Sequence, residues 1–163
     1  MPRDSRMSRM LHVLIHMDRH VKRATSEEIA KMLGTNPVVV RRTMSGLREK
    51  GYVTSEKGHG GGWELARGLE AITLLDVYRA IGEPPLFGIG PHTDRPDCLV
   101  ERAVDAHLEK TLGEAEALLT ARFGQITVAD LADDFERRLA KLKARTRADR
   151  VCSPAQLNRS SRG

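Results

Sequence analysis

Aromatic residues and cysteines are scarce in this chain of 163 residues. Aromatic residues make up 4% of it, so the core has to be built from Leu, Val, Ile, Ala and Met, a composition that favours helices. The two cysteines, Cys98 and Cys152, lie far apart and outside any Cys-x-x-Cys motif. That spacing supports neither a disulfide framework nor a zinc ribbon.

Long apolar runs are also missing. Residues 1–6 have no apolar core of the kind found in signal peptides, and no run reaches the roughly 20 residues that span a bilayer. We therefore expect a cytoplasmic protein without a membrane segment. A chain of this length supports one domain of ordinary size with an appended helix or tail.

An enzyme site is not indicated either. The glycines at 58 and 60–62 could suggest a nucleotide-binding loop, but such a loop needs a strand before it and a helix after it. Here a strand pattern follows the glycines, and no Gly-Lys-Ser/Thr sequence is present. No nucleophile with a partnered base is visible, so we expect no catalytic activity.

The basic charge is concentrated in the first part of the chain. Residues 1–68 carry 13 Lys and Arg against 7 Asp and Glu, a balance of +6, whereas residues 69–163 carry 14 against 15. A solvated surface could also be basic, but a local excess beside outward-facing arginines is the electrostatic footprint of phosphate binding.

The most informative stretch within that basic part is a helix pattern over Pro37–Lys50. Asn36 is a good N-cap, Pro37 suits the first helical position, and Gly51 is suited to end the helix. Its apolar residues recur at spacings of four and three: Val40, Met44 and Leu47. Its basic residues fall mainly on other faces of the helix. One side is expected to pack and the other to face outward.

A shorter helix is predicted just before it, at residues 27–33, with Thr25 or Ser26 as its cap. The turn 34–36 between the two helices has three residues and contains a glycine, which is helix-turn-helix spacing. An ordinary helical hairpin is the alternative. The basic second helix and the strand pattern that follows it favour a DNA reader.

A glycine-tipped hairpin is predicted directly after the reader helix. Residues 52–55 and 62–65 alternate apolar with polar side chains, and residues 56–61 separate them. We expect Lys57 and His59 at its tip to approach the DNA backbone or minor groove, because the neighbouring glycines permit close approach. A solvated turn charge is the alternative for Lys57.

Contacts to the DNA bases are expected from the N-terminal part of the reader helix, which enters the major groove in helix-turn-helix proteins. Arg41 is the favoured base reader, whereas Arg42 could equally bind a phosphate. Together with Lys57 and His59, the predicted DNA-binding residues are Asn36, Val38, Val39, Arg41, Arg42 and Ser45.

Two further helices and an irregular loop are predicted before the long helix. A helix at 5–20 carries an apolar stripe of Met7, Met10, Leu11, Leu14 and Ile15. His12, His16 and His20 recur every four residues on it, but nothing in sequence completes a metal site of three or four ligands, so we predict no metal.

A helix at 72–81, capped by Thr73, has a packed face of Leu74, Val77, Tyr78 and Ile81. Residues 83–97 hold four prolines and two glycines, which exclude a long helix.

A long amphipathic helix is predicted at 98–122, with Asp97 as its cap. Its apolar stripe is Val100, Val104, Leu108, Leu112, Ala115 and Leu119. Since a small winged domain cannot cover so long a stripe alone, we expect a second copy of the chain to bury it, with packing on its own chain as the alternative. A last helix at 127–145 and a disordered basic tail at 146–163 complete the chain.

The sequence at residues 47–55, 57–65 and 71–77 resembles the wing signature of a known family: LREKGYVTS, KGHGGGWEL and AITLLDV. The family is that of the Rrf-type winged helix-turn-helix regulators, which include the iron-sulfur cluster biogenesis repressor, a repressor that senses nitric oxide, and the cysteine metabolism repressor. The resemblance covers about residues 5–132. It implies a bacterial homodimer crossed through the long helix, each protomer placing one reader helix in the major groove, and a sensor near the start of the long helix.

The cysteine pattern departs from that of the cluster-binding members, which carry three cysteines in the loop and at the start of the long helix. Here Cys98 stands alone at the place of the last one, and His92 lies where the middle one would fall. A cluster normally requires thiolate ligands, so we predict no iron-sulfur cluster and no other cofactor. Cys98 is instead predicted to be a thiol sensor, with a small buried hydrophobic residue as the alternative.

These observations predict a mainly α fold with a small β-hairpin wing. We expect a winged helix-turn-helix domain at 1–82, a sensor loop at 83–97, a dimerisation helix and trailing helix at 98–145, and the tail at 146–163. The expected function is that of a dimeric, sequence-specific DNA-binding transcriptional repressor that responds to a redox or small-molecule signal. Its expected partners are double-stranded DNA and a second copy through residues 98–122. The alternative is a winged-helix protein-interaction module whose Arg41 face meets an acidic protein.

Overall fold

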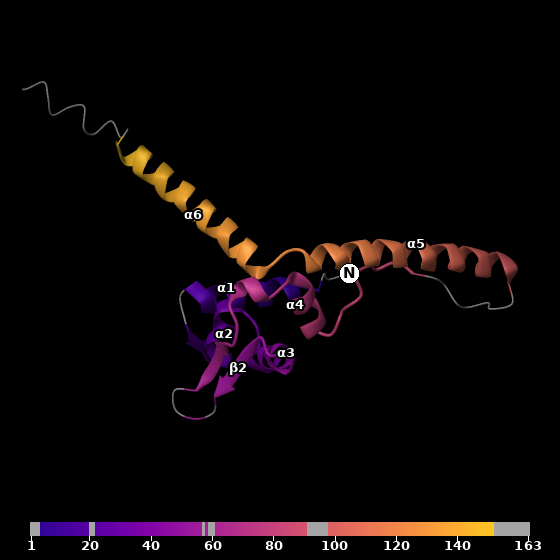
Figure 1. Ribbon diagram of the computed structural model, residues 1–163, viewed down its shortest axis with the longest axis horizontal. Helices are drawn as coiled ribbons and strands as arrows, with labels where there is room; N and C mark the ends of the chain where they lie inside the picture. The colour runs from indigo at the N-terminus through magenta and orange to yellow at the C-terminus, as the bar shows by residue number, and fades with distance from the viewer. Residues whose placement is uncertain (1–3, 20–21, 57, 59–60, 91–97, 152–163) are drawn as a thin grey trace, which may run out of the picture. The chain divides into compact units, whose positions relative to one another are not determined.

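The computed structural model describes residues 4–19, 22–56, 58, 61–90 and 98–151. The chain forms two compact units, Met1–Ala129 and Asp130–Gly163. The first unit holds most of the helices and a small three-stranded antiparallel sheet (Figure 1). This architecture confirms the predicted fold class, mainly α with a small β wing. In the described part of the chain, no helix is long and apolar enough to cross a membrane.

Three helices open the first unit, and their bounds agree with the predicted ones to within one residue at each end. They are α1 (Arg6–Arg19), α2 (Ser26–Leu33) and α3 (Pro37–Glu49). The buried face of α1 differs from the predicted stripe: Met10 and Leu14 are buried as expected, but their buried companions are Val13 and Met17. Met7, Leu11 and Ile15 are half-buried.

Local capping explains where α2 begins and ends. The Thr25 hydroxyl accepts a hydrogen bond from the backbone N–H of Glu28 at 3.2 Å, and the Glu28 carboxylate accepts one from the Thr25 N–H at 2.7 Å. This reciprocal pair is a capping box, so Thr25, and not Ser26, is the cap. Gly34 ends the helix with φ of 60°, a left-handed conformation that glycine adopts without steric cost. The chain then turns directly into α3.

The sheet contains one strand more than the predicted hairpin. Strands β2 (Val53–Glu56) and β3 (Gly62–Leu65) pair in antiparallel register, and β1 (Arg23–Ala24) pairs with the other side of β3. A Cβ on Gly62 would lie 2.8 Å from the carbonyl oxygen of Ala24, so a side chain there would push the two strands apart. The strand order is therefore β1-β3-β2, with the wing hairpin tied back to the segment before α2.

The core of the first unit is aliphatic, as the composition predicted. The predicted packing face of α3 is buried, and so are residues of the other helices and strands: Val13, Leu14, Ile29, Val40, Met44, Leu47, Val53, Ile72 and Val77 are at most 1% exposed. Burying each such side chain contributes about 1.5–3 kcal/mol relative to leaving it in water. Because one face of α3 packs into this shared core, its opposite face lies at the surface.

A second capping box starts α4 (Leu74–Ala80), which is shorter than the predicted helix at 72–81 and follows a 3₁₀ turn, η1 (Leu69–Ala71). Thr73 caps it, as predicted, with Asp76 as the reciprocal partner. Val77, Tyr78 and Ile81 of the predicted face are buried, whereas Leu74 is half-buried. The N–H of Val128 donates to the carbonyl of Ile72 at 2.8 Å, which holds the chain after the long helix against the start of α4.

The long helix is α5 (Leu99–Gly124), two residues longer at its end than predicted. None of its residues is buried, and it contacts α4, where the rings of Phe123 and Tyr78 lie 6.0 Å apart between centroids. The predicted cap Asp97 lies outside the described residues. Cys98 takes the N-cap position itself, without a side-chain capping bond, so the helix begins one residue later than predicted.

The last helix is α6 (Val128–Val151), most of which belongs to the second unit. It continues through Val151 and so overlaps the start of the range 146–163 that was predicted to be disordered, while residues 152–163 lie outside the described ones. On its surface the Asp134 carboxylate accepts hydrogen bonds from Arg138 at 2.5 Å and from Arg137 at 3.4 Å. The Arg138 hydrogen bond lowers the pKa of Asp134 most.

Candidate nucleic-acid interface

Helix α3 presents two different faces because of how it is capped and packed. The Asn36 side-chain oxygen accepts a hydrogen bond from the Val38 N–H at 2.8 Å, and Pro37 occupies the first turn. Both features were predicted from the sequence. With Val40 and Met44 buried, the first two turns leave Val38 65% and Val39 43% exposed. Two apolar side chains exposed at a helix start are suited to contact thymine methyl groups or the walls of a groove.

The predicted DNA-contact residues on α3 all lie at the surface, either exposed or half-buried. Asn36, Arg41 and Arg42 are exposed, and Ser45 is half-buried. Asn36 uses its oxygen for the cap, so its amide N–H groups are the part left for a DNA phosphate. The structure therefore brings these residues together along one helix, whereas Lys57 and His59 of the wing tip lie outside the described residues.

A groove of about 460 Å³ runs between the start of α2, the exposed side of α3 and the wing. Its lining includes the α3 side chains Arg41, Ser45 and Arg48, and Ser55 from β2. Arg48 donates a hydrogen bond to the Ser55 hydroxyl at 3.2 Å, and its guanidinium carbon lies 5.9 Å from the centre of the Trp63 ring. The arginine thus connects the end of α3 with the inner face of the wing.

The floor of the groove is fixed by a hydrogen bond between its two sides. The indole N–H of Trp63 in β3 donates to the hydroxyl of Ser26 in α2 at 2.9 Å, and both residues are at most 7% exposed. Trp63 pairs with Ser55 on β2 and with Ala24 on β1. Trp63 therefore connects the three strands through its backbone pairing and connects the sheet to α2 through its indole.

Ion pairs of the groove region modify its basic character. The Arg41 guanidinium donates to the Glu27 carboxylate, an ion pair between α3 and α2 in which both side chains are more than half exposed. Arg23 on β1 binds Glu56 at 2.6 Å and Glu64 at 2.8 Å, and its pKa is raised chiefly by the hydrogen bond to Glu64. The sheet's carboxylates are thus partly neutralised where the wing would approach a phosphate backbone.

Several of these residues were not found from the sequence. Ser26 was predicted as a possible cap of α2, but its hydroxyl accepts the hydrogen bond of the Trp63 indole, and no partner was predicted for Glu27. The sequence likewise indicated no partner for Arg48. Each of these contacts joins different elements of the fold, and no local pattern indicates which residues will meet.

The start of α5 is the predicted sensor position. Cys98 is exposed and carries a free thiol, so the alternative of a buried hydrophobic residue does not fit this structure. His92 lies outside the described residues. The segment that follows α4 is held against that helix at Pro84, because the Tyr78 hydroxyl donates a hydrogen bond to the Pro84 carbonyl at 2.9 Å.

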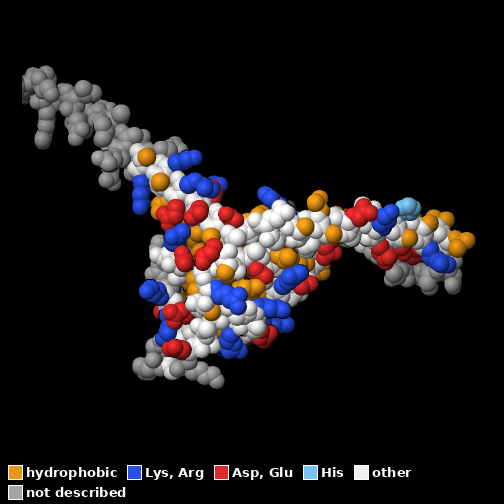
Figure 2. All heavy atoms as spheres, viewed as in Figure 1, with side chains coloured by type: hydrophobic (Ala, Val, Ile, Leu, Met, Phe, Trp, Pro, Cys, Tyr) orange, Lys and Arg blue, Asp and Glu red, His pale blue; other side chains and the backbone are white. Residues whose placement is uncertain are grey.

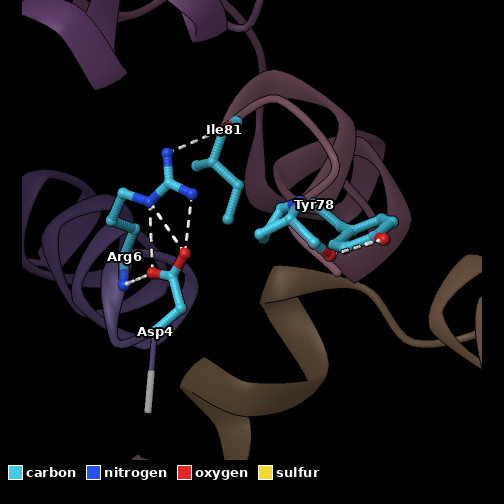
Figure 3. A network of polar contacts seen from close by, with 5 residues as sticks. Asp4, Arg6, Tyr78 and Ile81 are labelled. Atoms are coloured by element: carbon cyan, nitrogen blue, oxygen red, sulfur yellow. Dashed lines mark hydrogen bonds and ion pairs between the residues drawn. The ribbon is translucent and has the colours of Figure 1, made fainter. Parts of the chain in front are cut away.

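The far end of α4 is also tied to α1. Arg6 binds the carboxylate of Asp4, and one of its guanidinium nitrogens donates to the Ile81 carbonyl at 3.1 Å, on the side of α4 that faces α1 (Figure 3). The hydrogen bond with Arg6 lowers the pKa of Asp4. Helix α4 is therefore held at its C-terminus by α1 and contacts α5 through Tyr78.

The histidines of α1 were considered as a metal site and not predicted to be one. The rings of His12 and His16 lie 4.6 Å apart between centroids, and His20 lies outside the described residues. Among the residues that the structure describes, no group of three or more His, Cys, Asp or Glu side chains is placed to hold a metal ion.

Comparisons with known proteins agree with the winged helix-turn-helix geometry. The sequence profile of the Rrf2 family, described as iron-dependent transcriptional regulators, matches residues 3–134. YwnA of Bacillus subtilis, assigned as an HTH-type transcriptional regulator, is 31% identical over 131 residues, which are 78% of this chain and 95% of that protein. These likenesses are to transcriptional regulators and not to enzymes.

Solved structures show the same fold. A Lactobacillus plantarum protein, assigned as a transcriptional regulator, has 26% sequence identity and a TM-score of 0.69, and the match covers 88% of this chain and 98% of that one. IscR of T. potens is 20% identical with a TM-score of 0.57, and the match covers 85% of this chain and 90% of that one. The second likeness concerns the fold alone.

Proposed function

Because the chain belongs to the Rrf2 family of transcriptional regulators, we propose that it is a dimeric, sequence-specific DNA-binding repressor whose affinity responds to a redox or small-molecule signal. The observation that supports this most directly is the exposed N-terminal face of α3, with Val38, Val39, Arg41 and Arg42 beside a groove closed by the wing. That face has the size and charge to enter a major groove.

In the proposed complex α3 lies in the major groove with its first two turns at the base edges. Asn36 at the helix start binds a phosphate through its amide, and Ser45 lies further along the same groove. Lys57 and His59 of the wing tip contact the flanking backbone or minor groove. Phosphate contacts supply affinity, whereas the α3 side chains supply sequence preference.

Binding to duplex DNA at increasing salt tests this function. Selection from a randomised duplex pool should enrich one motif, and the logarithm of the affinity should fall linearly with the logarithm of salt concentration. Lys57→Ala should reduce that slope by about one contact. If no duplex is bound, or all duplexes are bound equally, the repressor is excluded and the protein-interaction module takes its place.

Dimerisation through α5 is the second part of the proposal. Apolar side chains gather at the surface of the N-terminal part of this helix (Figure 2). Leu99, Val100 and Val104 are 76%, 72% and 51% exposed, and with Ala103, His107 and Leu108 they line an apolar depression of about 550 Å³. A monomer rarely leaves such a continuous apolar stripe in water. A second copy of α5 crossing it would bury these side chains.

The oligomeric state of charge-substituted variants tests the dimer. Val104→Glu places a carboxylate within the stripe and should yield monomers in sedimentation experiments, with weaker binding to a two-half-site operator. Arg102→Glu introduces the same side chain two positions away, on the opposite side of the helix, and should remain dimeric. A dimer that tolerates Val104→Glu contradicts this interface.

The proposed signal acts on Cys98, which is exposed at the N-terminus of α5. Hydrogen peroxide would oxidise the thiolate to a sulfenic acid with release of hydroxide. Because this residue begins the proposed dimer helix, a change there would alter the separation of the two reader helices. DNA affinity of the wild type should change with mild peroxide, and that of Cys98→Ser should not. Equal responses of both proteins would exclude Cys98 as the sensor.

A further inference from the structure

Two neighbouring arginines on the exposed face of α3 have different surroundings. The Nη2 group of Arg41 donates to Oε1 of Glu27 on α2. For Arg42, the described part of the chain offers no hydrogen bond or ion pair. Both arginines are exposed, yet the guanidinium of Arg41 is held by a second helix and that of Arg42 is not.

Glu27 is not required for the fold of its own helix. The capping box of α2 is made by Thr25 and Glu28, and Glu27 stands beside it with its carboxylate directed to α3. Its side chain is 62% exposed, so the ion pair contributes little to stability. The pair instead spans the groove edge, because Glu27 and Arg41 both line it.

We propose that Glu27 is a positioning residue that orients Arg41 for reading a guanine, an inference that rests on the proposed DNA-binding function. A guanidinium has five N–H donors, and Glu27 takes one on Nη2. The remaining donors can still offer a pair to O6 and N7 of guanine. A side chain that is already oriented loses less rotamer freedom on binding, and this preorganisation favours the bidentate geometry.

The same carboxylate also decides what Arg41 binds. A negative charge next to the guanidinium repels a phosphate but tolerates the neutral guanine edge, so Glu27 directs Arg41 to a base. Arg42, which has no carboxylate partner among the described residues, is free to bind a phosphate. The two adjacent arginines therefore divide recognition: Arg41 contributes sequence preference, and Arg42 contributes affinity.

The test starts from the full-length protein and a randomised duplex pool. The wild type defines a preferred duplex, and Arg41→Ala identifies the base pair whose preference depends on Arg41. Affinities for the preferred duplex and for the duplex changed at that pair are then measured for Glu27→Gln, which keeps the side-chain shape. We expect the ratio of the two affinities to fall about twofold to fivefold, as an exposed charge pair allows. In the Arg41→Ala background, Glu27→Gln should produce no further fall.

A matched control separates positioning from general charge. Glu49→Gln removes one negative charge from the end of the same α3 helix, at an exposed residue distant in sequence from Arg41, and should leave the ratio unchanged. Thermal unfolding should be the same for all three proteins. The inference is overturned, while the DNA-binding function stands, if Glu27→Gln keeps the affinity ratio of the wild type. It is also overturned if Glu27→Gln lowers the ratio equally in the wild-type and Arg41→Ala backgrounds. An Arg41→Ala protein that keeps every base preference overturns it as well. A wild type without any sequence preference overturns both.

Discussion

Gly46 on α3 lies so close to Ala80 on α4 that a Cβ at position 46 would be 2.0 Å from the Ala80 carbonyl oxygen. Helix α3 therefore packs against α4 through its backbone, without a side chain between them at this point. Because Tyr78 of the same short helix contacts Phe123 of α5, α4 connects the proposed reader with the proposed dimer helix. A shift of α5 would reach α3 through this contact.

Gly46→Ala should lower the free energy of unfolding by about 1–3 kcal/mol, the usual cost of forcing an extra group into a packed contact. The obstacle is a backbone oxygen, so α3 and α4 have to separate for the methyl group to fit. Urea denaturation of the wild type and the variant measures the loss.

Gly113→Ala is the control, because a Cβ at that position in α5 meets no atom within 4 Å. Alanine in the interior of a helix is favoured over glycine by about 0.5–1 kcal/mol, so this variant should be as stable as the wild type or more stable. If both variants behave alike, the close contact between α3 and α4 is not important for stability.

Removal of the Ser26 hydroxyl should also destabilise the protein. Ser26→Ala leaves the buried indole N–H of Trp63 without its partner, and an unsatisfied buried donor costs about 1–3 kcal/mol. Ser26→Thr keeps a hydroxyl and serves as the comparison. Thermal denaturation should rank Ser26→Ala lowest. An unchanged melting temperature for Ser26→Ala would mean that the hydrogen bond has no net value.

The helix-turn-helix could be predicted from sequence because its signals are local. Asn36 and Pro37 mark the start of α3, and the spacing of Val40, Met44 and Leu47 marks its buried face. All of these signals lie within one helix, where period and capping chemistry fully specify the outcome. The same holds for Thr73, which was predicted to cap α4 and does so.

What could not be predicted depends on contacts between distant segments. The strand β1 has two residues, too few to show alternation, and it exists because β3 offers it a partner. The Glu27 to Arg41 pair requires the crossing of α2 and α3, and the Trp63 to Ser26 bond requires the wing to fold back. The stripe on α1 was misplaced because its apolar residues exceed one face, and tertiary packing selected Val13 and Met17.

Asp76 should make the stability of the fold sensitive to acid. Burial alone would raise its pKa, but hydrogen bonds from Tyr52 and Thr73 outweigh it and hold the pKa of Asp76 below its usual value. A carboxylate with a depressed folded-state pKa stabilises the fold above its unfolded pKa, and this contribution is lost as the pH falls through the folded value. Asp76→Ala should therefore cost about 0.5–2 kcal/mol at neutral pH, as loss of a capping interaction does.

Urea denaturation of Asp76→Ala at pH 7 and in steps below pH 4 measures this dependence. The difference from the wild type should shrink as the acid protonates Asp76 in the folded protein. Glu70→Gln, at an exposed residue of η1, should show no comparable difference. A constant difference at all pH values would assign the effect of Asp76→Ala to helix propensity instead of the carboxylate.

Tyr52 should produce the opposite dependence at alkaline pH. Burial first, and then the hydrogen bond to Asp76, raise the pKa of Tyr52 to about 12. In the unfolded chain a tyrosine loses its proton near pH 10, at about its ordinary pKa. The contribution of Tyr52 to the free energy of unfolding is therefore fully present below pH 10 and is lost as the pH rises towards 12, because the folded protein keeps the Tyr52 proton up to a higher pH than the unfolded chain does. Relative to Tyr52→Phe, the wild type should be more stable at pH 8, and its advantage should decrease above pH 10. Tyr78, whose pKa is also raised by burial, is present in both proteins and cancels in the comparison.

Absorbance titration at alkaline pH checks the assignment directly: if the folded wild type ionises a tyrosine near pH 10 that Tyr52→Phe lacks, the hydrogen bond to Asp76 is too weak to hold the proton.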